Sequence, residues 1–353
     1  MSSTLDLGRP PRDDATRRAA ASRSLRSQAG WLTAALAVTV VAALASIALG
    51  VRFVGPQDLV DGLRGHDDTI ASAAVVKRIP RTLLALLVGA ALGLAGAVMQ
   101  GVTRNPLADP GLLGVTSGAA LAVVTGMVFF GLAAPSSYIW VAIAGSAIAA
   151  VFVYAVGSLG RGGATPLKLA LAGAATSAAF TSLISALLLP RIDVMDKFRF
   201  WQIGGVGGAS YDSLSLALPF LVLGALVCLG CARGLNSLAL GDDVAAGLGE
   251  RVAVTRLAAA VGAVMLCGAA TAVAGPIAFV GLVVPHLCRL LIGVDHRWLL
   301  PTSAVAGAAL LTASDVVGRL VARPSEVDVG IVTAFVGAPF FIWIVRRTRV
   351  RAL

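Results

Sequence analysis

The fold is decided by residues 78–118, which read RIPRTLLALLVGAALGLAGAVMQGVTRNPLADPGLLGVTSG. The run from 82 to 102 contains no charged side chain. At about 1.5 Å per residue, a helix of this length spans the roughly 30 Å hydrocarbon core of a bilayer. Gly89 and Gly93 form a GxxxG pair, and such small faces let helix backbones approach closely in lipid. The stretch therefore predicts a tightly packed membrane helix.

The two ends of this apolar run differ in character. Arg78 and Arg81 stand at its start, and the compact polar segment 103–111 follows its end. In that segment Asn105 and Asp109 each precede a proline, which is the pairing of N-cap and first helical residue that begins a helix. We therefore expect a short turn there, with the next span beginning at the second proline.

The composition excludes a soluble globular protein. The chain has 353 residues, of which 58% are hydrophobic and only 13% charged, whereas soluble chains carry roughly 25% charged residues. The formal net charge is +10, which alone would suit nucleic-acid binding. However, the arginines lie between apolar segments rather than along a stripe with aromatic residues, so no nucleic-acid partner is expected. Lys and Arg beside membrane spans follow the positive-inside rule instead.

Apolar runs and their breaks predict an all-α polytopic membrane protein with about ten transmembrane helices, surrounded by lipid. The expected spans are 32–53, 80–102, 111–132, 137–158, 168–189, 213–233, 254–274, 276–292, 299–320 and 327–346. An even number of spans puts both termini on one side, and most Lys and Arg residues lie on that side. The positive-inside rule makes it cytoplasmic. Ahead of the membrane domain, 31–347, we expect a disordered basic arm, 1–30, and behind it a cytoplasmic tail, 348–353. The first apolar run is longer than the 7–15 residues of a signal-peptide core, so we expect it to remain as a span.

Two loops carry local signals. The outer loop 190–212 holds four aromatic residues suited to a membrane interface, and part of it is expected to form a short surface helix. The inner loop 234–253 predicts a short helix in which Gly241 breaks the chain, Asp242 caps the helix, and Val244 and Leu248 share one face. Gly249 is well placed to end it. A helix this short is unstable alone, so it either fits a partner's groove or lies as a connector on the membrane.

Two further segments bear on the path and the outer surface. Residues 275–298 form a second Gly/Pro-interrupted stretch, with Pro285 inside the eighth span, and broken spans are typical of transport paths. Asp315 and Arg319 stand at i,i+4 near the outer end of the ninth span, where they can neutralise each other.

The chain lacks the motifs of an enzyme. It contains no G-x-x-x-x-G-K-[ST] sequence, so it is expected to carry no ATPase site, and no G-x-S-x-G nucleophile elbow. Its three histidines lack metal-ligand spacing, and its four cysteines lie in or beside apolar segments as inert residues. No catalytic residue, metal or cofactor is expected. We expect His286, near the inner end of the eighth span, to have a packing or interface role.

Four blocks of the chain resemble the FecCD-type permeases, in order and at the spacing of that family. They are RIPRTLLALLVGAALGLAGAVMQGVTRNPLADPGLLGVTSGAAL, LALGDDVAAGLGE, AGPIAFVGLVVPHLCRLLIGVDHRWLLP and DVVGRL…SEVDVGIVTAFVGAPFFIWIVRR. Such permeases are membrane subunits of ABC importers for iron-siderophores, haem and cobalamin, in the bacterial cytoplasmic membrane. The resemblance implies the BtuC-like fold of ten spans, a second permease subunit (the same chain or a related one), ATP-binding cassette ATPase subunits on the cytoplasmic side, and a substrate-binding protein outside.

The resemblance also implies roles for particular residues. The outer cations that meet acidic residues of the binding protein are Arg78, Arg81 and Arg319. The segment similar to the coupling helix in the ATPase groove contributes Leu240, Gly241, Asp242, Val244, Ala245, Leu248 and Gly249. The inner gate and path are assigned to Gln100, Asn105, Leu107, Thr165 and Pro166. At positions 166 and 167 the cobalamin branch has hydroxyl side chains, whereas proline and leucine stand here, which favours another cargo.

The leading hypothesis is the translocation subunit of an ABC importer, with a ferric siderophore as its cargo. One alternative is a secondary carrier for a small metabolite, but such carriers usually need carboxylates within the membrane, and Asp315 is the sole candidate. A second alternative is a membrane-embedded enzyme, which would need clustered polar catalytic groups that the sequence does not contain.

Overall fold

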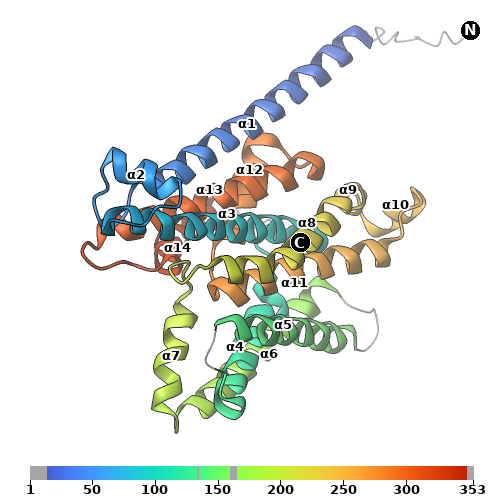
Figure 1. Cartoon of the computed structure of the whole chain (residues 1–353). Coiled ribbons are helices and arrows are strands. Elements are labelled where there is room, and N and C mark those ends of the chain that lie inside the picture. Colours follow the sequence, from blue (N-terminus) through green and yellow to red (C-terminus); the bar gives the residue numbers. More distant parts are fainter. Residues whose placement is uncertain (1–13, 133–134, 160–164, 348–353) are drawn as a thin grey trace, which may run out of the picture.

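The computed structural model describes residues 14–132, 135–159 and 165–347 (Figure 1), and every regular element within them is helical. The first half contains α1 (Asp14–Ala48), α2 (Pro56–Leu63), α3 (Ile70–Thr103), the 3-10 helix η1 (Pro110–Leu113), α4 (Val115–Phe130), α5 (Pro135–Ser158) and α6 (Pro166–Leu188). The second half contains α7 (Ile192–Ile203), α8 (Tyr211–Gly230), α9 (Ala232–Leu238), α10 (Asp242–Gly247), α11 (Val252–Ala274), α12 (Val280–Ile292), α13 (His296–Val321) and α14 (Val329–Arg347).

The helices match the expected spans. Seven of the described helices, α1, α3, α5, α6, α8, α11 and α13, are long and apolar enough to cross a membrane. The shorter apolar helices α4, α12 and α14 fall on the remaining three expected spans. The prediction of an all-α polytopic membrane protein is therefore confirmed.

The basic arm predicted ahead of the membrane domain is described only from Asp14 onward. α1 begins at Asp14, so residues 14–30 of the arm that was expected to be disordered form a helix here. Residues 1–13 and the expected tail 348–353 lie outside the described residues. Figure 1 shows the N-terminal part of α1 projecting away from the other helices.

α3 runs through the centre of the molecule between α11, α12 and α13 (Figure 1). It begins at Ile70, ten residues before the expected start, because Thr69 and Ser72 form a capping box there. Pro80 lies inside the helix rather than at its beginning. The small face predicted from GxxxG does pack within the subunit: a Cβ on Gly89 would stand 2.4 Å from the carbonyl oxygen of Gly307.

The broken segment of the second half is a real interruption of helix, but its position differs from the expectation. α11 ends at Ala274, and residues 275–279 are non-helical before α12 begins. Gly275 has φ +70, and a Cβ there would stand 2.2 Å from the carbonyl oxygen of Trp201. The loop therefore requires glycine. Pro285, in contrast, lies inside α12 without ending it.

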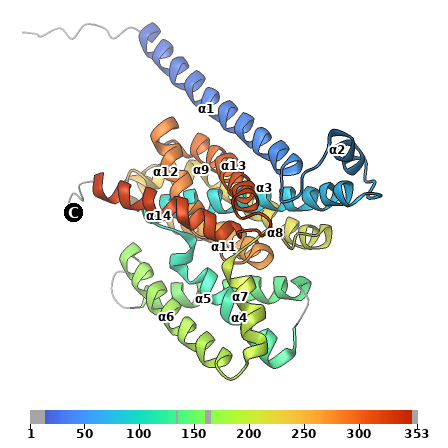
Figure 2. The same cartoon turned by 90° about the vertical axis from the view of Figure 1, so that its left-hand side faces the viewer.

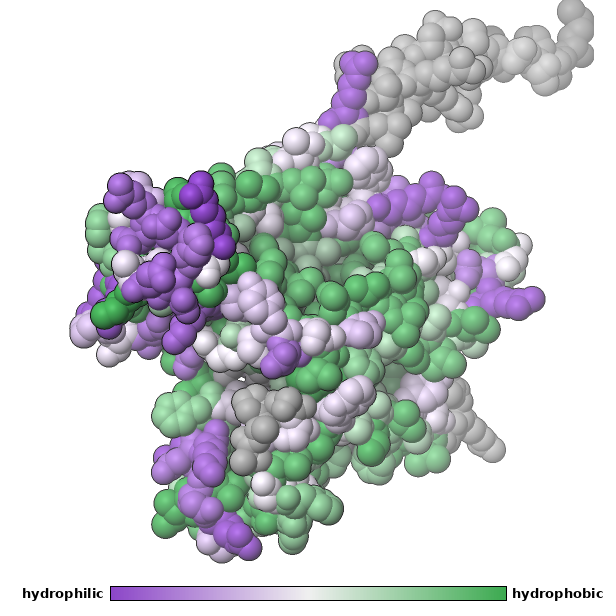
Figure 3. Space-filling model, in the orientation of Figure 1, coloured by the Kyte–Doolittle hydropathy of each residue, from purple (hydrophilic) through white to green (hydrophobic). Residues whose placement is uncertain are grey.

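The helices α4, α5, α6 and α7 form a second group. Figure 2 shows α4, α5, α6 and α7 on one side of α11 and α14, with α1 on the other. α7 is the short helix expected in the outer loop, although Phe198 is buried in the core and does not lie at an interface. In Figure 3 hydrophilic residues cover α2 at one end and the region of α9 and α10 at the other, with an apolar surface between them. This pattern is typical of a membrane-spanning domain whose two ends are exposed to water.

Candidate coupling and docking surfaces

An apolar stripe made by Leu240 ahead of α10, Val244 within it and Leu248 at its C-cap lies at the end of the molecule predicted to face the cytoplasm, the inner end. Leu240, Val244 and Leu248 recur every four residues and are 61%, 51% and 66% exposed, respectively. Ala245, on the opposite side, is completely buried and packs into the core. An exposed row of large apolar side chains over a short helix is the feature that an amphipathic helix offers to a groove.

Two glycines bracket α10 as the sequence predicted. Gly241 has φ +111 and Gly249 has φ +85, so both adopt conformations that other residues avoid. The predicted cap is wrong, however: Gly241 is the N-cap, and the Asp242 side chain does not cap the helix. Its carboxylate instead binds two cations that the sequence did not connect to it.

Those cations are Arg104 and Arg256. Asp242 Oδ1 accepts a hydrogen bond from Arg104 Nη2 and another, at 2.8 Å, from Arg256 Nη2. Arg104 is the C-cap of α3 and has φ 51, whereas Arg256 lies near the start of α11. One carboxylate therefore joins α10 to the inner ends of two spans.

The capping pattern predicted for the turn after α3 is right for Asp109, which begins η1, but wrong for Asn105, which begins no helix. The next span, α4, starts at Val115 and not at Pro110. Asn105 Oδ1 accepts a hydrogen bond from the amide of Leu107, and Asp109 Oδ1 accepts one from the amide of Gly111 at the start of η1. The first cap closes a turn and the second begins a helix. Asn105 and Leu107 are exposed.

The other expected gate residues lie in different surroundings. Thr165 is exposed and caps α6, with Pro166 as the first helical residue. Gln100 is buried: its amide donates to the carbonyl oxygens of Gly281 and Leu282, and its oxygen accepts from Arg289 Nη2 at 2.6 Å. Gln100 thus fastens α12 to α3 in this structure.

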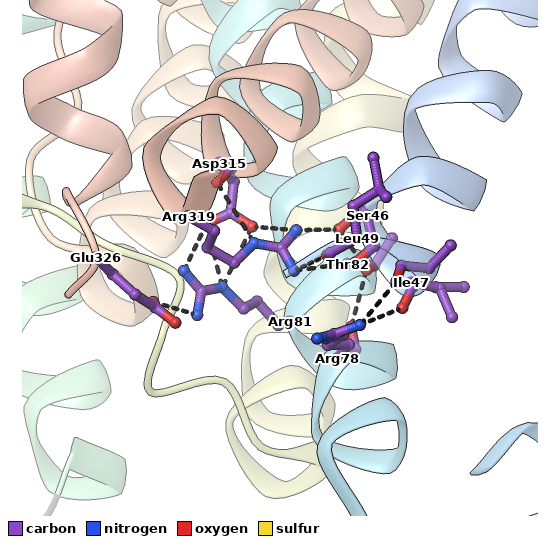
Figure 4. A network of polar contacts seen from close by, with 10 residues as sticks. Ser46, Ile47, Leu49, Arg78, Arg81, Thr82, Asp315, Arg319 and Glu326 are labelled. Carbon is purple, nitrogen blue, oxygen red and sulfur yellow. Dashed lines mark hydrogen bonds and ion pairs between the residues drawn. The ribbon is translucent and has the colours of Figure 1, made fainter. Parts of the chain in front are cut away.

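At the opposite end, predicted to be the outer one, arginines gather around the carboxyl terminus of α1 (Figure 4). Arg319 donates to the carbonyl oxygens of Ser46 and Leu49 and to the Ser46 hydroxyl, at 2.7 to 3.1 Å. Arg78 donates to the carbonyl oxygens of Ile47, Ala48 and Arg52. These carbonyls lack partners within the helix, so the two guanidinium groups cap α1 from α13 and α3.

Acidic residues complete this outer cluster. The predicted Asp315–Arg319 pair is present at 2.9 Å. Asp315 also binds Arg81 at 2.8 Å, and Arg81 in turn binds Glu326, ahead of α14, at 2.7 Å. Both acids face Arg81 in Figure 4.

The cluster brings together the three arginines expected to face a binding protein, but it does not leave them free. Arg78 and Arg319 are only 7% and 2% exposed. Arg81, nearer the surface, keeps 13% of its side chain exposed. Sequence reasoning missed Ser46, Glu326 and Arg256. Ser46 and Glu326 lie 273 and 245 residues from Arg319 and Arg81. Arg256 lies 14 residues from Asp242, on a different helix, so no spacing within one helix relates the two.

The histidines and cysteines form no metal centre in the described part of the chain. No group of three or more His, Cys, Asp or Glu side chains there is arranged to hold an ion. All four cysteines are free. The ring of His286 packs edge-on against Phe340, with centroids 6.5 Å apart, which fits the predicted packing role.

Comparisons with known proteins identify the family of this chain. The FecCD transport family model matches residues 38–347. The chain is 44% identical to the ferric enterobactin transport system permease protein FepD of Escherichia coli, covering 88% of this chain and 93% of FepD. It is 42% identical to the iron(3+)-hydroxamate import system permease protein FhuB of Bacillus subtilis, covering 90% and 83%.

A solved structure has the same fold. An inward-facing metal-chelate type ABC transporter superposes with a TM-score of 0.79 at 29% identity, over 91% of this chain and 99% of that one. These relatives support an ABC permease rather than a secondary carrier or a membrane enzyme. The chain belongs to the FecCD transport family and is a permease subunit of an ABC transporter.

Proposed function

We propose that this chain is the translocation subunit of an importer for ferric siderophores in the bacterial cytoplasmic membrane, with both termini in the cytoplasm. The cargo proposal rests on two relatives that carry ferric enterobactin and iron(3+)-hydroxamate. No ATP is hydrolysed by this chain: a separate ATPase subunit supplies the energy, and the permease changes which side its path is open to.

The observation that carries this proposal is the exposed stripe of α10. Leu240, Val244 and Leu248 present apolar surface to water at the inner end, which costs free energy unless a partner covers it. An ATPase groove is the occupant that fits a subunit without an ATP site of its own. In this proposal Gly241 and Gly249 set the angle of the helix, and Ala245 holds it to the core.

Two other partners belong to the proposal. A second permease subunit packs against the apolar face of α14, where Ile331 and Phe335 are exposed beside Ile203 of α7. An extracytoplasmic binding protein docks at the outer end. Of the three clustered arginines, Arg81 is the one within reach of its acidic side chains, while Arg78 and Arg319 act indirectly by holding α1.

The path closes on the inside at the turn after α3 and the start of α6. Asn105, Leu107 and Thr165 are exposed there, and Pro166 fixes the entry to α6. Gln100 contributes by fastening α12, whose N-terminus follows the non-helical segment 275–279.

The ATPase contact tests the proposal directly. The chain would be expressed with its ATPase subunit, and the Leu248→Asp variant compared with Leu63→Asp, the same change at an exposed leucine of α2 on the outer face. We expect Leu248→Asp to lose the ATPase on purification and Leu63→Asp to retain it. Retention by Leu248→Asp, or no ATPase bound to the unmodified chain, would overturn the proposal.

A further inference from the structure

One carboxylate at the inner face connects three elements that are separate in the sequence. Asp242 of α10 binds Arg104 at the end of α3 and Arg256 of α11 through the same oxygen atom, Oδ1. No other ion pair of α10 is present among the described residues.

α10 has little else to hold it in place. Ala245 is its one buried side chain among the described residues. The glycines at 241 and 249 that bracket it have open space around them, since a Cβ on either would meet no atom within 4 Å. Among the described residues, the side chains that attach α10 to the rest of the molecule are Ala245 and Asp242.

Arg104 and Arg256 belong to the rigid part of the molecule. α3 continues without interruption from Arg104 to Ile70 and packs against α11, α12 and α13. Its residue Arg81 takes part in the outer cluster, and Asn105 of the inner turn directly follows Arg104. Asp242 is thus bonded to the end of a helix that reaches both ends of the membrane domain.

The strength of these ion pairs depends on what covers them. The side chains of Asp242, Arg104 and Arg256 are 44%, 37% and 29% exposed, and ion pairs in contact with water contribute little to stability. A protein seated on the stripe of α10 would exclude water from them, and the same charges attract more strongly at lower dielectric. We therefore expect the two ion pairs of Asp242 to be weak in the free subunit and stronger when a partner docks.

We propose that Asp242 is a positioning residue that transmits movement of α10 to the inner ends of α3 and α11 through Arg104 and Arg256. The inference rests on the proposed docking of an ATPase at α10. It adds that the carboxylate is needed to convert ATP hydrolysis into transport and is not needed to hold the ATPase.

The test uses the whole transporter in liposomes, with three readouts: ATPase subunit retained, ATP hydrolysed and ferric siderophore transported. Asp242→Asn is compared with Asp243→Asn, the same change at the adjacent exposed residue of α10. We expect Asp242→Asn to retain and drive the ATPase while transport per ATP falls by about tenfold, within the usual range of coupling between sites. We expect Asp243→Asn to transport as the unmodified chain does.

A double substitution tests whether Asp242 and Arg104 act through their mutual contact or through a general effect of charge. In the Asp242→Asn background, Arg104→Gln should cause no further loss, because residues acting through one contact are non-additive. Normal transport per ATP in Asp242→Asn would overturn the inference, and so would loss of the ATPase from that variant or an additive effect of Arg104→Gln. If the unmodified chain retains no ATPase, the proposed function itself fails.

Discussion

Gly96 of α3 and Gly281 of α12 lie in backbone contact: a Cβ on Gly96 would stand 1.9 Å from the carbonyl oxygen of Gly281. No side chain fits between the two helices at this point. Gly93 makes a similar approach to the carbonyl oxygen of Ser303 in α13, at 2.2 Å. The backbones of α12 and α13 therefore contact α3 directly, as is typical of small-residue packing in lipid.

Gly96→Ala should destabilise the membrane domain by about 1–3 kcal/mol or more, because the added methyl group forces α12 away from α3. The measurement is the thermal midpoint of the purified chain in detergent. Gly230→Ala is the control, since a Cβ at that position of α8 meets no atom within 4 Å. Equal midpoints for the two variants would contradict the close packing of α3 and α12.

Arg319→Met should destabilise the chain by about 3–5 kcal/mol, the usual effect of removing one partner from a buried ion pair. The substitution leaves Ser46 and Leu49 without the donors that cap α1, and it removes one of the two cations at Asp315. Arg319→Lys should also be poorly tolerated, because an ammonium lacks the planar fork that serves several acceptors.

The control for this prediction is Arg199→Ala on α7. Arg199 is 65% exposed, and the ion pair that it forms with Asp196 is 4.0 Å long. Its removal should leave the thermal midpoint nearly unchanged. A small effect of Arg319→Met would show that α1 does not depend on this cap.

Glu326→Gln should strengthen association of the binding protein. Glu326 occupies Arg81 Nη1 at 2.7 Å in the free subunit, so a carboxylate of the binding protein has to compete with it. In the Glu326→Gln variant, Nε and Nη2 of Arg81 still donate to the Asp315 carboxylate. Affinity would be measured on nanodisc-embedded transporter, and the gain should shrink at high salt.

Asp68→Asn distinguishes competition from a general charge effect. Asp68 is an exposed acid between α2 and α3. If it raises affinity as much as Glu326→Gln does, the change reflects the field of the outer face and not the Arg81 contact. Weaker binding by Glu326→Gln would refute the prediction outright.

Asp295 should make a pH-dependent contribution to stability. It caps α13 by accepting a hydrogen bond from the Arg297 amide, and it accepts a second from Asn236 Nδ2 of α9 at 2.6 Å. Burial by itself would raise the pKa of the Asp295 carboxyl, but these hydrogen bonds and the nearby cations bring it below its usual value. A depressed folded pKa stabilises the protein above the unfolded pKa of about 3.9, and this stability is lost as pH falls through the folded value.

The measurement is the thermal midpoint of the unmodified chain and of Asp295→Asn from pH 7 downward. Asparagine keeps an acceptor oxygen for both donors and removes only the charge, so the two midpoints should differ at pH 7 and converge below about pH 4. Asp295→Ala, which removes the cap, should cost about 0.5–2 kcal/mol at pH 7. A difference between the aspartate and asparagine forms that is independent of pH would contradict the assignment.

Local features of this protein were predictable wherever the interacting residues are close in sequence. The Asp315–Arg319 pair, the glycines at 241 and 249 and the cap at Asp109 all follow from spacings of a few residues. The cap at Asp242 failed because a competing interaction was available. Arg104 and Arg256 attract its carboxylate, and charged partners outweigh a single backbone amide.

The sequence by itself determined the number and order of the apolar helices and the family to which they belong. Those properties depend on the lengths and order of apolar runs, because a span has to be long and apolar enough to cross the hydrocarbon core. Only the tertiary structure decided that Arg78 and Arg319 turn inward to cap α1, and that one carboxylate of α10 holds both α3 and α11. Arg319 reaches Ser46 across 273 residues of chain, and such contacts arise from the packing of helices and not from any periodicity along them.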